Sequence, residues 1–598
     1  MVLVLQFLGG LVLGFLLPGY ALARWLGADN RWCWAFPLSM VLLFWAVFAA
    51  GICGLPVTGP IVGGLLIVET LAIFLLSGKG APRDLPSAGD APRTRAARPI
   101  VWGLFILVAV VLFRTTLWPL SGYDTSFRWD FLARRMLLEH GFSFYPPIGA
   151  ADYRIYFYTD GIPPLVSFSY AWLYTAAGGW HPSLTSILVA AQLALTLWFI
   201  YSIGRKTHSP LAGLLAAGIL GGSTLYIRSV AIGQETGLTA LSVAAMFDAV
   251  AGRRDGRAMV LAGVAAALGA LSREYGCVIP VLGAVAVVWL GAGLKKALIL
   301  ATTTAILAGP WYLRNWLVAG NPFYSNHFLS FHVNAMHVAI LDYYRTFIGV
   351  STWNLRQWLV VGLSLLEQAP LQCTLGLFAI VMFFRRSGFL ALTAATFGLL
   401  WLDSVGYTSG IWLYSMRVLT PALVALSIPA GRFIATARRS RPWMIATFAS
   451  VAWSILAASV HPFFVTEPHL LRHWTDVVRS TTRPEARWWT ALPRVLRPGA
   501  RVLCANPYIH AGLTSSGIDF VPVWSPEVAF IADPSISPNT VRQRLLDRGI
   551  RYAVVENDPN GHFLAEYVPF YHADMRFWTV IASAGNDASV FEIPAPNH

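Results

Sequence analysis

Residues 99–118 read PIVWGLFILVAVVLFRTTLW, and Arg114 is the only charged residue among them. A helix needs about 20 predominantly apolar residues to cross the hydrocarbon core of a bilayer, so this run predicts a membrane span. A second run, SILVAAQLALTLWFIYSIG at 186–204, has the same character, and such runs recur to about residue 461. The chain is 56% hydrophobic and 12% charged, against about 25% charged residues in ordinary soluble proteins. The sequence therefore predicts a polytopic α-helical membrane protein with about 13 to 14 spans.

The apolar runs divide the chain into three parts. Residues 1–98 hold three N-terminal spans and an Ala/Pro/Arg-rich cytoplasmic linker. The first of these spans lacks the basic start of a cleaved signal peptide. Residues 99–461 form the main transmembrane core, and residues 462–598 are long enough for a separate domain.

The last part has the pattern of an α/β domain. RVLCAN at 501–506 and RYAVVEND at 551–558 have the character of short buried strands. SPNTVRQRLLDRG at 537–549 has the Ser-Pro start, the apolar period and the terminal glycine of a helix. No glycine-rich phosphate loop or nucleophile motif occurs in this domain.

The formal net charge of +14 would suggest a nucleic-acid partner in a soluble protein. Here the basic residues gather in short loops between apolar runs, where the positive-inside rule places them on the cytoplasmic side. These loops are 78–99, 204–208, 252–257, 294–296, 385–386 and 432–441. We therefore attribute the charge to membrane topology and expect no nucleic-acid partner.

The number of spans between two cytoplasmic loops must be even, yet three apolar stretches lie between residues 99 and 204. The weakest is IPPLVSFSYAWLYTAAG at 162–178, which is short, starts with two prolines and is rich in the aromatics of membrane interfaces. We expect it to be a juxtamembrane or re-entrant helix. Residues 119–182 then form one large external loop, and the C-terminal domain lies on the same side.

Several motifs carry the polar residues of this external side. An acidic stretch at 124–130 precedes LARRML, and the later motifs are IPPLVSFSYAWLY, GRKTHSPLAGLLAAGIL, IGQETGLTALSVAAM, ALSREYGCVIP, GPWYLRNWLVAGNPFYSNHF and YSMRVLTPALVAL. In this order they resemble the GT-C superfamily of membrane glycosyltransferases, in particular the branch with lipid A aminoarabinose transferases and protein O-mannosyltransferases. The resemblance covers about residues 99 to 461.

The sequence departs from that family in three places. The family's adjacent acidic pair is represented by Asp124 followed by Thr125, and Ile162 stands where a basic residue often precedes the two prolines. The three spans before residue 78 are additional to the usual arrangement. The acceptor and the requirement for a divalent metal therefore stay open.

The resemblance implies an inverting glycosyltransferase that moves a sugar from a polyprenyl-phosphate-linked donor to an acceptor hydroxyl on the external face. Such a reaction needs a carboxylate as general base and arginines around the phosphate leaving group. Asp124 is the predicted base. Acceptor or cavity support is assigned to Asp130, Asp160 and Glu235, and phosphate binding to Arg273, Arg314 and Arg417.

Each of these residues also has a purely structural interpretation. Asp124 can pair with Arg128, and Asp130 with Arg134 at helical i, i+4 spacing, which is the favoured reading for Asp130. Glu235 can serve as an acidic residue at a helix N-terminus. The arginines can extend to the interface as ordinary snorkelling residues, and Arg314 is expected to be structural.

Two further groups have open roles. The aromatic residues of the external loop either stack on sugars or form an aromatic belt; they are Trp129, Tyr153, Tyr156 and Tyr158. His327, His332 and His337 are spaced by five residues, which does not hold two of them on one helical face, and the five cysteines lack metal-ligand spacing. No histidine or cysteine metal site is therefore expected.

Two other function classes compete with a transferase. One is a transporter or flippase of a lipid-linked glycan, which would place charged groups near the bilayer midplane. The other is a noncatalytic membrane scaffold. The partners expected for the transferase are the lipid-linked donor and a lipid, glycan or protein acceptor. The arginine-rich composition and a C-terminus without an endoplasmic reticulum retrieval signal favour a bacterial inner membrane.

Overall fold

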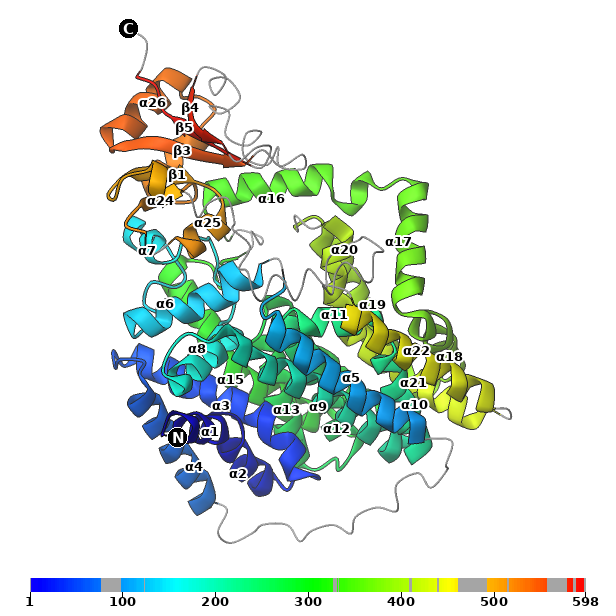
Figure 1. Ribbon diagram of the computed structural model, residues 1–598. Helices are drawn as coiled ribbons and strands as arrows, with labels where there is room; N and C mark the ends of the chain where they lie inside the picture. Colours follow the sequence, from blue (N-terminus) through cyan, green and yellow to red (C-terminus); the bar gives the residue numbers. More distant parts are fainter. Residues whose placement is uncertain are drawn as a thin grey trace.

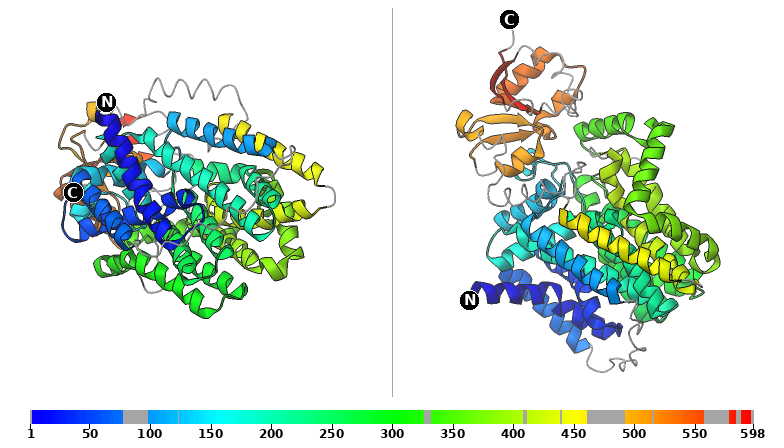
Figure 2. Two further views of the ribbon diagram at one scale, coloured as in Figure 1. Left: turned by 90° about the horizontal axis from the view of Figure 1, so that it is seen from below. Right: turned by 45° about the vertical axis from the view of Figure 1, so that its right-hand side comes forward.

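The computed structural model describes residues 2–76, 98–122, 124–325, 331, 333–407, 411–437, 440–460, 492–513, 516–556, 578–583 and 588–595. A bundle of tilted helices forms the body of the molecule, and a small sheet domain stands over one side of it (Figures 1 and 2). The boundary expected near residue 461 lies outside the described residues.

The N-terminal part consists of α1 (Val2–Phe15), α2 (Leu17–Leu26), α3 (Arg31–Ile52) and α4 (Gly59–Leu76). Together α1 and α2 supply one stretch that is long and apolar enough to span a membrane, and α3 and α4 supply two more. Residues 119–182, which the sequence predicts to be external, are called the external loop below. Trp172 in this loop donates its indole N–H to the Gly10 carbonyl at 2.9 Å and so joins α1 to the core.

The core and its external loop run from α5 to α22. The spans and their neighbours are α5 (Arg98–Leu117), α9 (Thr185–Thr207), α10 (Pro210–Gly221), α11 (Thr224–Ala231), α12 (Glu235–Ala251), α13 (Gly256–Ala270), η4 (Glu274–Cys277), α14 (Val278–Trp289) and α15 (Leu294–Ala319). Later come α16 (Ala335–Phe347), η5 (Val350–Thr352), α17 (Leu355–Gln368), η6 (Gln372–Gly376), α18 (Leu377–Met382), α19 (Phe384–Val405), α20 (Ile411–Ser415), η7 (Met416–Leu419), α21 (Thr420–Thr436) and α22 (Arg441–Val460). The external loop holds η2 (Thr125–Asp130), α6 (Phe131–Glu139), α7 (Ala150–Ile155), α8 (Leu165–Ala177) and η3 (Pro182–Leu184).

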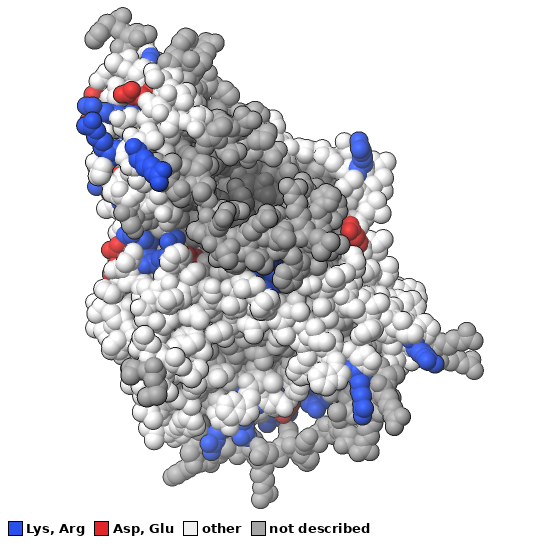
Figure 3. All heavy atoms as spheres, viewed as in Figure 1, with Lys and Arg blue, Asp and Glu red and all other residues white. Residues whose placement is uncertain are grey.

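Eight helices in the described ranges are long and apolar enough to cross a membrane, or ten if each of two sharply bent pairs forms one span. The chain is therefore a multi-pass membrane protein, as its composition predicts. The expected 13 to 14 spans also counted shorter segments, such as α13 and the η4–α14 segment, which lie beside the long helices. Figure 3 shows a broad band of uncharged surface between charged residues at the two ends of the helical body.

The helix at 165–177 differs from the expectation in its surroundings. With 13 residues it measures about 20 Å, too short for a span, which agrees with the parity argument. Its aromatic side chains, however, do not face an interface: Phe168, Tyr170, Trp172 and Tyr174 are all buried. Because α1, α3 and α6 surround α8, these rings belong to the protein core.

Charged residues also join the ends of α9 and α12 to the N-terminal part. Lys206 at the end of α9 pairs with Asp248 in the last turn of α12 at 2.8 Å and lies 3.6 Å from Asp29. Asp29 lies between α2 and α3, so this cluster joins the N-terminal part to the core.

The C-terminal domain has a five-stranded sheet in the order β2-β1-β3-β5-β4. Its strands are β1 (Arg501–Cys504), β2 (Asp519–Pro522), β3 (Ile550–Glu556), β4 (Thr579–Ser583) and β5 (Ala588–Glu592), and its helices are α24 (Leu492–Val495), α25 (Pro507–Gly512), η9 (Pro526–Ala532) and α26 (Pro538–Asp547). β1 is parallel to β2 and β3, whereas β5 is antiparallel to β3 and β4. The predicted strands and the Ser537-capped helix are confirmed, and so is the predicted fold class.

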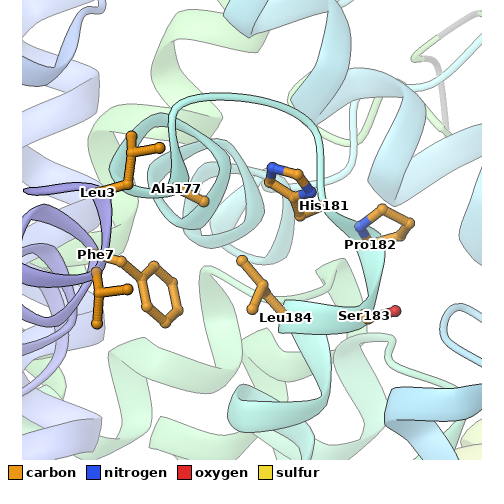
Figure 4. A pocket seen from close by; sticks show the side chains of 8 residues that line it. Leu3, Phe7, Ala177, His181, Pro182, Ser183 and Leu184 are labelled. Atoms are coloured by element: carbon orange, nitrogen blue, oxygen red, sulfur yellow. The ribbon is translucent and has the colours of Figure 1, made fainter. Parts of the chain in front are cut away.

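An apolar cavity of about 400 Å³ lies between α1 and the link from α8 to α9 (Figure 4). Leu3, Phe7, Ala177 and Leu184 line it together with His181. None of the predicted site residues contributes to its wall.

Close helix packing in the core leads to a stability prediction. A Cβ at Gly431 in α21 would lie 2.5 Å from the Ala212 carbonyl oxygen and from the Ala216 nitrogen, both in α10. Gly431→Ala should therefore destabilise the protein by about 1–3 kcal/mol, because backbone atoms cannot move aside cheaply. Thermal unfolding in detergent measures the effect.

Gly398→Ala is the matched control, since a Cβ at Gly398 in α19 meets nothing within 4 Å. This variant should be neutral or more stable through its better helix propensity. Equal melting temperatures for the two variants would contradict the packing described for α10 and α21.

Candidate active site

Asp124 lies directly before η2, at the start of the external loop. The next residue fixes the segment, since the Thr125 hydroxyl donates to the Ile232 carbonyl at 2.9 Å. Gln234 donates its side-chain amide to Asp124 and also to the Thr125 hydroxyl, the latter at 2.7 Å. The turn between α11 and α12 therefore holds Asp124 in place, although it is more than a hundred residues away in sequence.

Arg128 connects the two aspartates of the loop. Its Nη1 donates to Asp124 Oδ2 at 3.0 Å, and its Nε lies 2.6 Å from Asp160 Oδ2. Asp160 is fully buried and also accepts the backbone N–H of Ile162 at 3.2 Å. The sequence predicts Asp124 and Asp160 at opposite ends of one external segment. In the structure both contact the guanidinium of Arg128.

Arg417 in η7 approaches Asp124 from the other side. Its Nη1 and Nη2 donate to Asp124 Oδ1 and Oδ2 at 3.2 and 3.4 Å, the paired geometry in which arginine meets a carboxylate. Tyr414 donates its hydroxyl to Asp124, accepts from Arg417 Nη1 at 2.8 Å, and lies with its ring 4.1 Å from the guanidinium carbon. Asp124 therefore has two cations and two neutral donors around it.

These contacts determine the charge state of Asp124. Burial by itself would raise the pKa of its carboxyl, but Arg417 and Arg128, with the Tyr414 hydroxyl, outweigh burial and hold that pKa well below its usual range. In this arrangement Asp124 is a carboxylate at any physiological pH. A carboxylate with so low a pKa is a weak proton acceptor while both arginines remain on it.

Arg273 and Glu235 form a second polar group beside the first. Arg273 pairs with Glu274 through its Nε at 3.2 Å, but its buried Nη1 has no hydrogen-bond partner in the part of the chain that the structure describes. Glu235, the first residue of α12, is 1% exposed, and its Oε2 likewise has no hydrogen-bond partner among these described residues. Arg273 and Arg417 both interact electrostatically with Glu235 and with Asp124 or Asp160. Unpartnered buried groups of opposite charge are a feature of ligand sites.

Two predicted site residues lie elsewhere. Asp130 pairs with Arg134 at 3.0 Å and accepts from Tyr174 and Trp180, so the structural reading of Asp130 holds. Arg314 donates to the Tyr145 carbonyl at 2.8 Å and stacks on neighbouring rings. Neither residue contacts the Asp124 cluster through an ion pair or hydrogen bond in the described part of the chain.

The loop aromatics also have a structural role. Trp129, Tyr153 and Tyr156 are buried to within 1% of full burial, so they neither form a membrane belt nor present a face to a sugar. Only Tyr158 is partly exposed, and its ring lies 4.8 Å from the Arg128 guanidinium carbon.

Three contributors were not among the predicted site residues: Arg128, Gln234 and Tyr414. Each had a local signal, because Arg128 follows Asp124 by four residues, Gln234 precedes Glu235, and Tyr414 precedes Arg417 by three. Spacings of three and four place residues on one helical face. None of these local signals predicts that the segments around Gln234 and Tyr414, far away in the sequence, contact Asp124.

The described residues contain no group of three or more His, Cys, Asp and Glu side chains arranged to hold a metal ion. His327 and His332 lie outside the described residues. His337 is buried in α16, where its Nε2 lies 3.1 Å from the Ser325 carbonyl oxygen, and burial lowers its pKa to about 4.

No protein-family model and no curated protein matches the sequence. Among solved structures, the chain is similar to ArnT from Cupriavidus metallidurans bound to undecaprenyl phosphate, with 14% identity, a TM-score of 0.49 and coverage of 83% of this chain and 98% of that chain. It is also similar to the Archaeoglobus fulgidus oligosaccharyltransferase in the apo form, with 12% identity, a TM-score of 0.43 and coverage of 80% and 72%. Both are GT-C proteins, the superfamily that the sequence motifs resemble. With TM-scores of 0.49 and 0.43, these similarities by themselves assign no activity to this chain.

Because Arg128 pairs with both Asp124 and Asp160, its removal should have a measurable effect on the free energy of unfolding. Arg128→Met removes one cation from two buried carboxylates and should destabilise the protein by about 3–5 kcal/mol at neutral pH. The pKa of Asp124 is lower in the folded protein than its value of about 3.9 in the unfolded chain. The stability that follows from this difference is present above about pH 4 and is lost as the pH falls through the pKa of the folded protein. The difference from wild type should therefore shrink below about pH 4, as thermal unfolding at several pH values would show.

Arg154→Met serves as the control, because Arg154 lies in the same loop with a side chain 58% exposed and only a 3.9 Å contact to Glu527. It should change stability by less than about 0.5 kcal/mol. An Arg128→Met variant as stable as this control at pH 7 would contradict the bridging role.

Proposed function

We propose that this protein is an inverting glycosyltransferase that moves a sugar from a polyprenyl-phosphate-linked donor to an acceptor hydroxyl on the external membrane face. The observation that carries the proposal is the sharing of Asp124 between Arg128 and Arg417, next to Arg273 with its unpartnered Nη1. A general base and a set of phosphate ligands are the two parts that this reaction requires.

The arginines suit a lipid phosphate. Arg128, Arg273 and Arg417 come from the external loop, the end of α13 and η7, and all three interact electrostatically with Asp124. Guanidinium groups bind phosphate oxygens through paired hydrogen bonds and keep their charge when buried. Because Arg273 Nη1 has no hydrogen-bond partner among the described residues, it is the donor to which a phosphate oxygen can bind first.

The low pKa of Asp124 sets a condition on the order of events. With Arg417 on it, Asp124 is too weak a base to take a proton from a hydroxyl. A donor phosphate attracts the same guanidinium, so binding of the donor draws Arg417 away from Asp124 and restores its basicity. The base is therefore activated only when the leaving group is in place.

The transfer step follows from this arrangement. The acceptor oxygen attacks the anomeric carbon while Asp124 takes the hydroxyl proton, and a new glycosidic bond forms. The bond from the anomeric carbon to the phosphate oxygen breaks on the opposite face, and its electron pair leaves with the phosphate. Arg273 and Arg417 stabilise that phosphate, which needs no proton because it is already a good anionic leaving group.

The remaining carboxylates divide into two roles. Asp160 is already held by Arg128 and the Ile162 N–H, so it positions Arg128. Glu235 has an unpartnered oxygen and can accept a hydrogen bond from a hydroxyl of the sugar or the acceptor. Charge balance around the phosphate comes from arginines in this account, and no step depends on a metal ion.

The proposed setting is a bacterial inner membrane, with the C-terminal domain in the periplasm. The charged groups of α12 support this orientation. Glu235 is the first residue of α12. Asp248 lies in the last turn of α12, beside the basic loops, and pairs there with Lys206 of α9. Both groups lie at helix ends, as expected for a surface transferase and unlike the midplane sites typical of transporters.

Removal of the base tests the proposal. Purified protein, incubated with a panel of polyprenyl-phosphate sugars and candidate acceptors, should release polyprenyl phosphate with at least one donor. Asp124→Asn should lower kcat by about 1,000-fold or more, since it removes general-base catalysis and the charge that positions the arginines. Lipid extraction and mass spectrometry of the released phosphate measure turnover.

Asp152→Asn is the control, since Asp152 lies in the same loop and caps α7 through the Gly149 N–H. It should keep turnover near wild type. Absence of release with every donor, from protein whose unfolding transition is intact, would contradict the proposal. Equal release by Asp124→Asn and by wild type would exclude Asp124 as the general base.

Arg273 is expected to act on donor binding. Arg273→Gln removes a proposed phosphate ligand whose Nη1 has no hydrogen-bond partner among the described residues. KM for the donor should therefore rise about tenfold or more. Arg273→Lys should restore part of the affinity, because charge remains but the paired geometry is lost. An unchanged donor KM in Arg273→Gln would exclude Arg273 from the phosphate site.

A further inference from the structure

Trp524 follows β2, is 3% exposed, and joins the C-terminal domain to the candidate site through its contact with Tyr158. We propose that this domain contributes to the site by positioning Arg128 and Arg273, and that Trp524 is the positioning residue. The inference rests on the proposed function, and it assigns a role to a domain that carries no motif of its own.

The first connection runs through the ring of Trp524. Its centroid lies 5.0 Å from that of Tyr158, edge to face at 68°. The Arg128 guanidinium also lies over the ring of Tyr158, 4.8 Å from the ring centroid. Arg128 then pairs with Asp124 and Asp160. Tyr158 is thus held between the domain and the cation that joins the two aspartates.

The second connection starts at the backbone of Trp524. Its carbonyl accepts the side-chain amide of Asn334, whose Oδ1 in turn caps α16 by accepting the Met336 N–H at 3.0 Å. The first turn of this helix carries His337, whose ring packs on Tyr158 at 5.8 Å between centroids. The domain therefore fixes the start of α16 as well as the ring of Tyr158.

From α16 the connection continues to the second arginine. His337 contacts the Ser325 carbonyl at 3.1 Å, and the Ser325 hydroxyl donates to Glu274. Glu274 pairs with Arg273 at 3.2 Å. Two separate sets of contacts thus lead from Trp524 to the two arginines that lie on either side of the proposed reaction centre.

The C-terminal domain packs against the external loop at several further residues, and is not joined to it by the chain alone. His510 of α25 packs on Phe157 at 4.5 Å and on Phe131 at 5.9 Å, both in the external loop. Tyr153 and Ile340 share one buried apolar cluster with Val523 of the domain. Packed contacts of this kind can hold a side chain in one rotamer, which a tether cannot do.

The test uses the full-length protein and separates positioning from folding. Trp524→Ala should lower kcat about tenfold or more with a smaller change in donor KM, because the arginines lose their fixed placement. The acid limb of kcat/KM should move to higher pH, since displacement of Arg128 raises the pKa of Asp124. Trp524→Phe, which keeps a ring against Tyr158, should recover most of the activity.

Trp578→Ala is the matched control, because Trp578 is a buried tryptophan of the same domain whose ring packs on Phe591 at 6.2 Å. It should leave the pH profile unchanged even if it lowers the melting temperature. An identical loss of kcat and an identical pH profile in Trp524→Ala and Trp578→Ala would overturn the inference, as would wild-type kinetics in Trp524→Ala.

Tyr158→Leu provides a second route if Trp524→Ala does not fold. It should reproduce the loss of kcat and the shift of the acid limb of kcat/KM, because it removes the ring that contacts both Trp524 and Arg128. Wild-type kcat and a wild-type pH profile in Tyr158→Leu would overturn the inference. Wild-type protein and Asp124→Asn assayed in parallel show whether the transferase activity itself is present, so a failure of the proposed function is seen separately.

Discussion

The ion pairs of Arg128 are the interaction on which the external half of this protein depends. A guanidinium buried between Asp124 and Asp160 joins the start of the external loop to the segment just before α8. Without it, two carboxylates would remain in a buried environment with too few partners, which costs several kcal/mol. The fold of the loop around α6, α7 and α8 brings this pairing about, and the pairing in turn fixes where Asp124 faces Arg417.

This arrangement also sets a chemical constraint. The contacts that stabilise Asp124 lower its pKa and so reduce its strength as a base. In the proposed mechanism the site is inactive at rest and becomes reactive when the donor phosphate competes for Arg417. Coupling of activation to binding of the leaving group would keep Asp124 a weak base as long as no donor is bound.

Much of the architecture could be predicted because it follows from local patterns. Apolar run length gave the spans, the parity of basic loops removed residues 165–177 from that list, and strand and helix signals identified β1, β3 and α26. The site was predicted only in part. Asp124, Arg417 and Arg273 were placed on one face, but topology alone could not show that Asp160 returns to the same guanidinium or that Gln234 reaches Asp124.

The errors have a common physical cause. The loop aromatics were expected at a membrane belt or on a sugar because a loop of that size was treated as surface. Trp129, Tyr153 and Tyr156 are buried instead, since the loop packs into the apolar core that it shares with the helices and, at Tyr153, against the C-terminal domain. Arg128 was treated as a mere partner of Asp124, since its second carboxylate lies 32 residues further along the chain, at Asp160.

Equilibrium binding of polyprenyl phosphate to wild-type protein and to Asp124→Asn tests the central claim most directly. If Asp124 and the phosphate compete for Arg417, the Asp124→Asn variant should bind the lipid phosphate at least as tightly as wild type, although it cannot turn over. Binding that is lost in this variant would contradict the account, because Asp124 would then be needed only to hold the arginines in place.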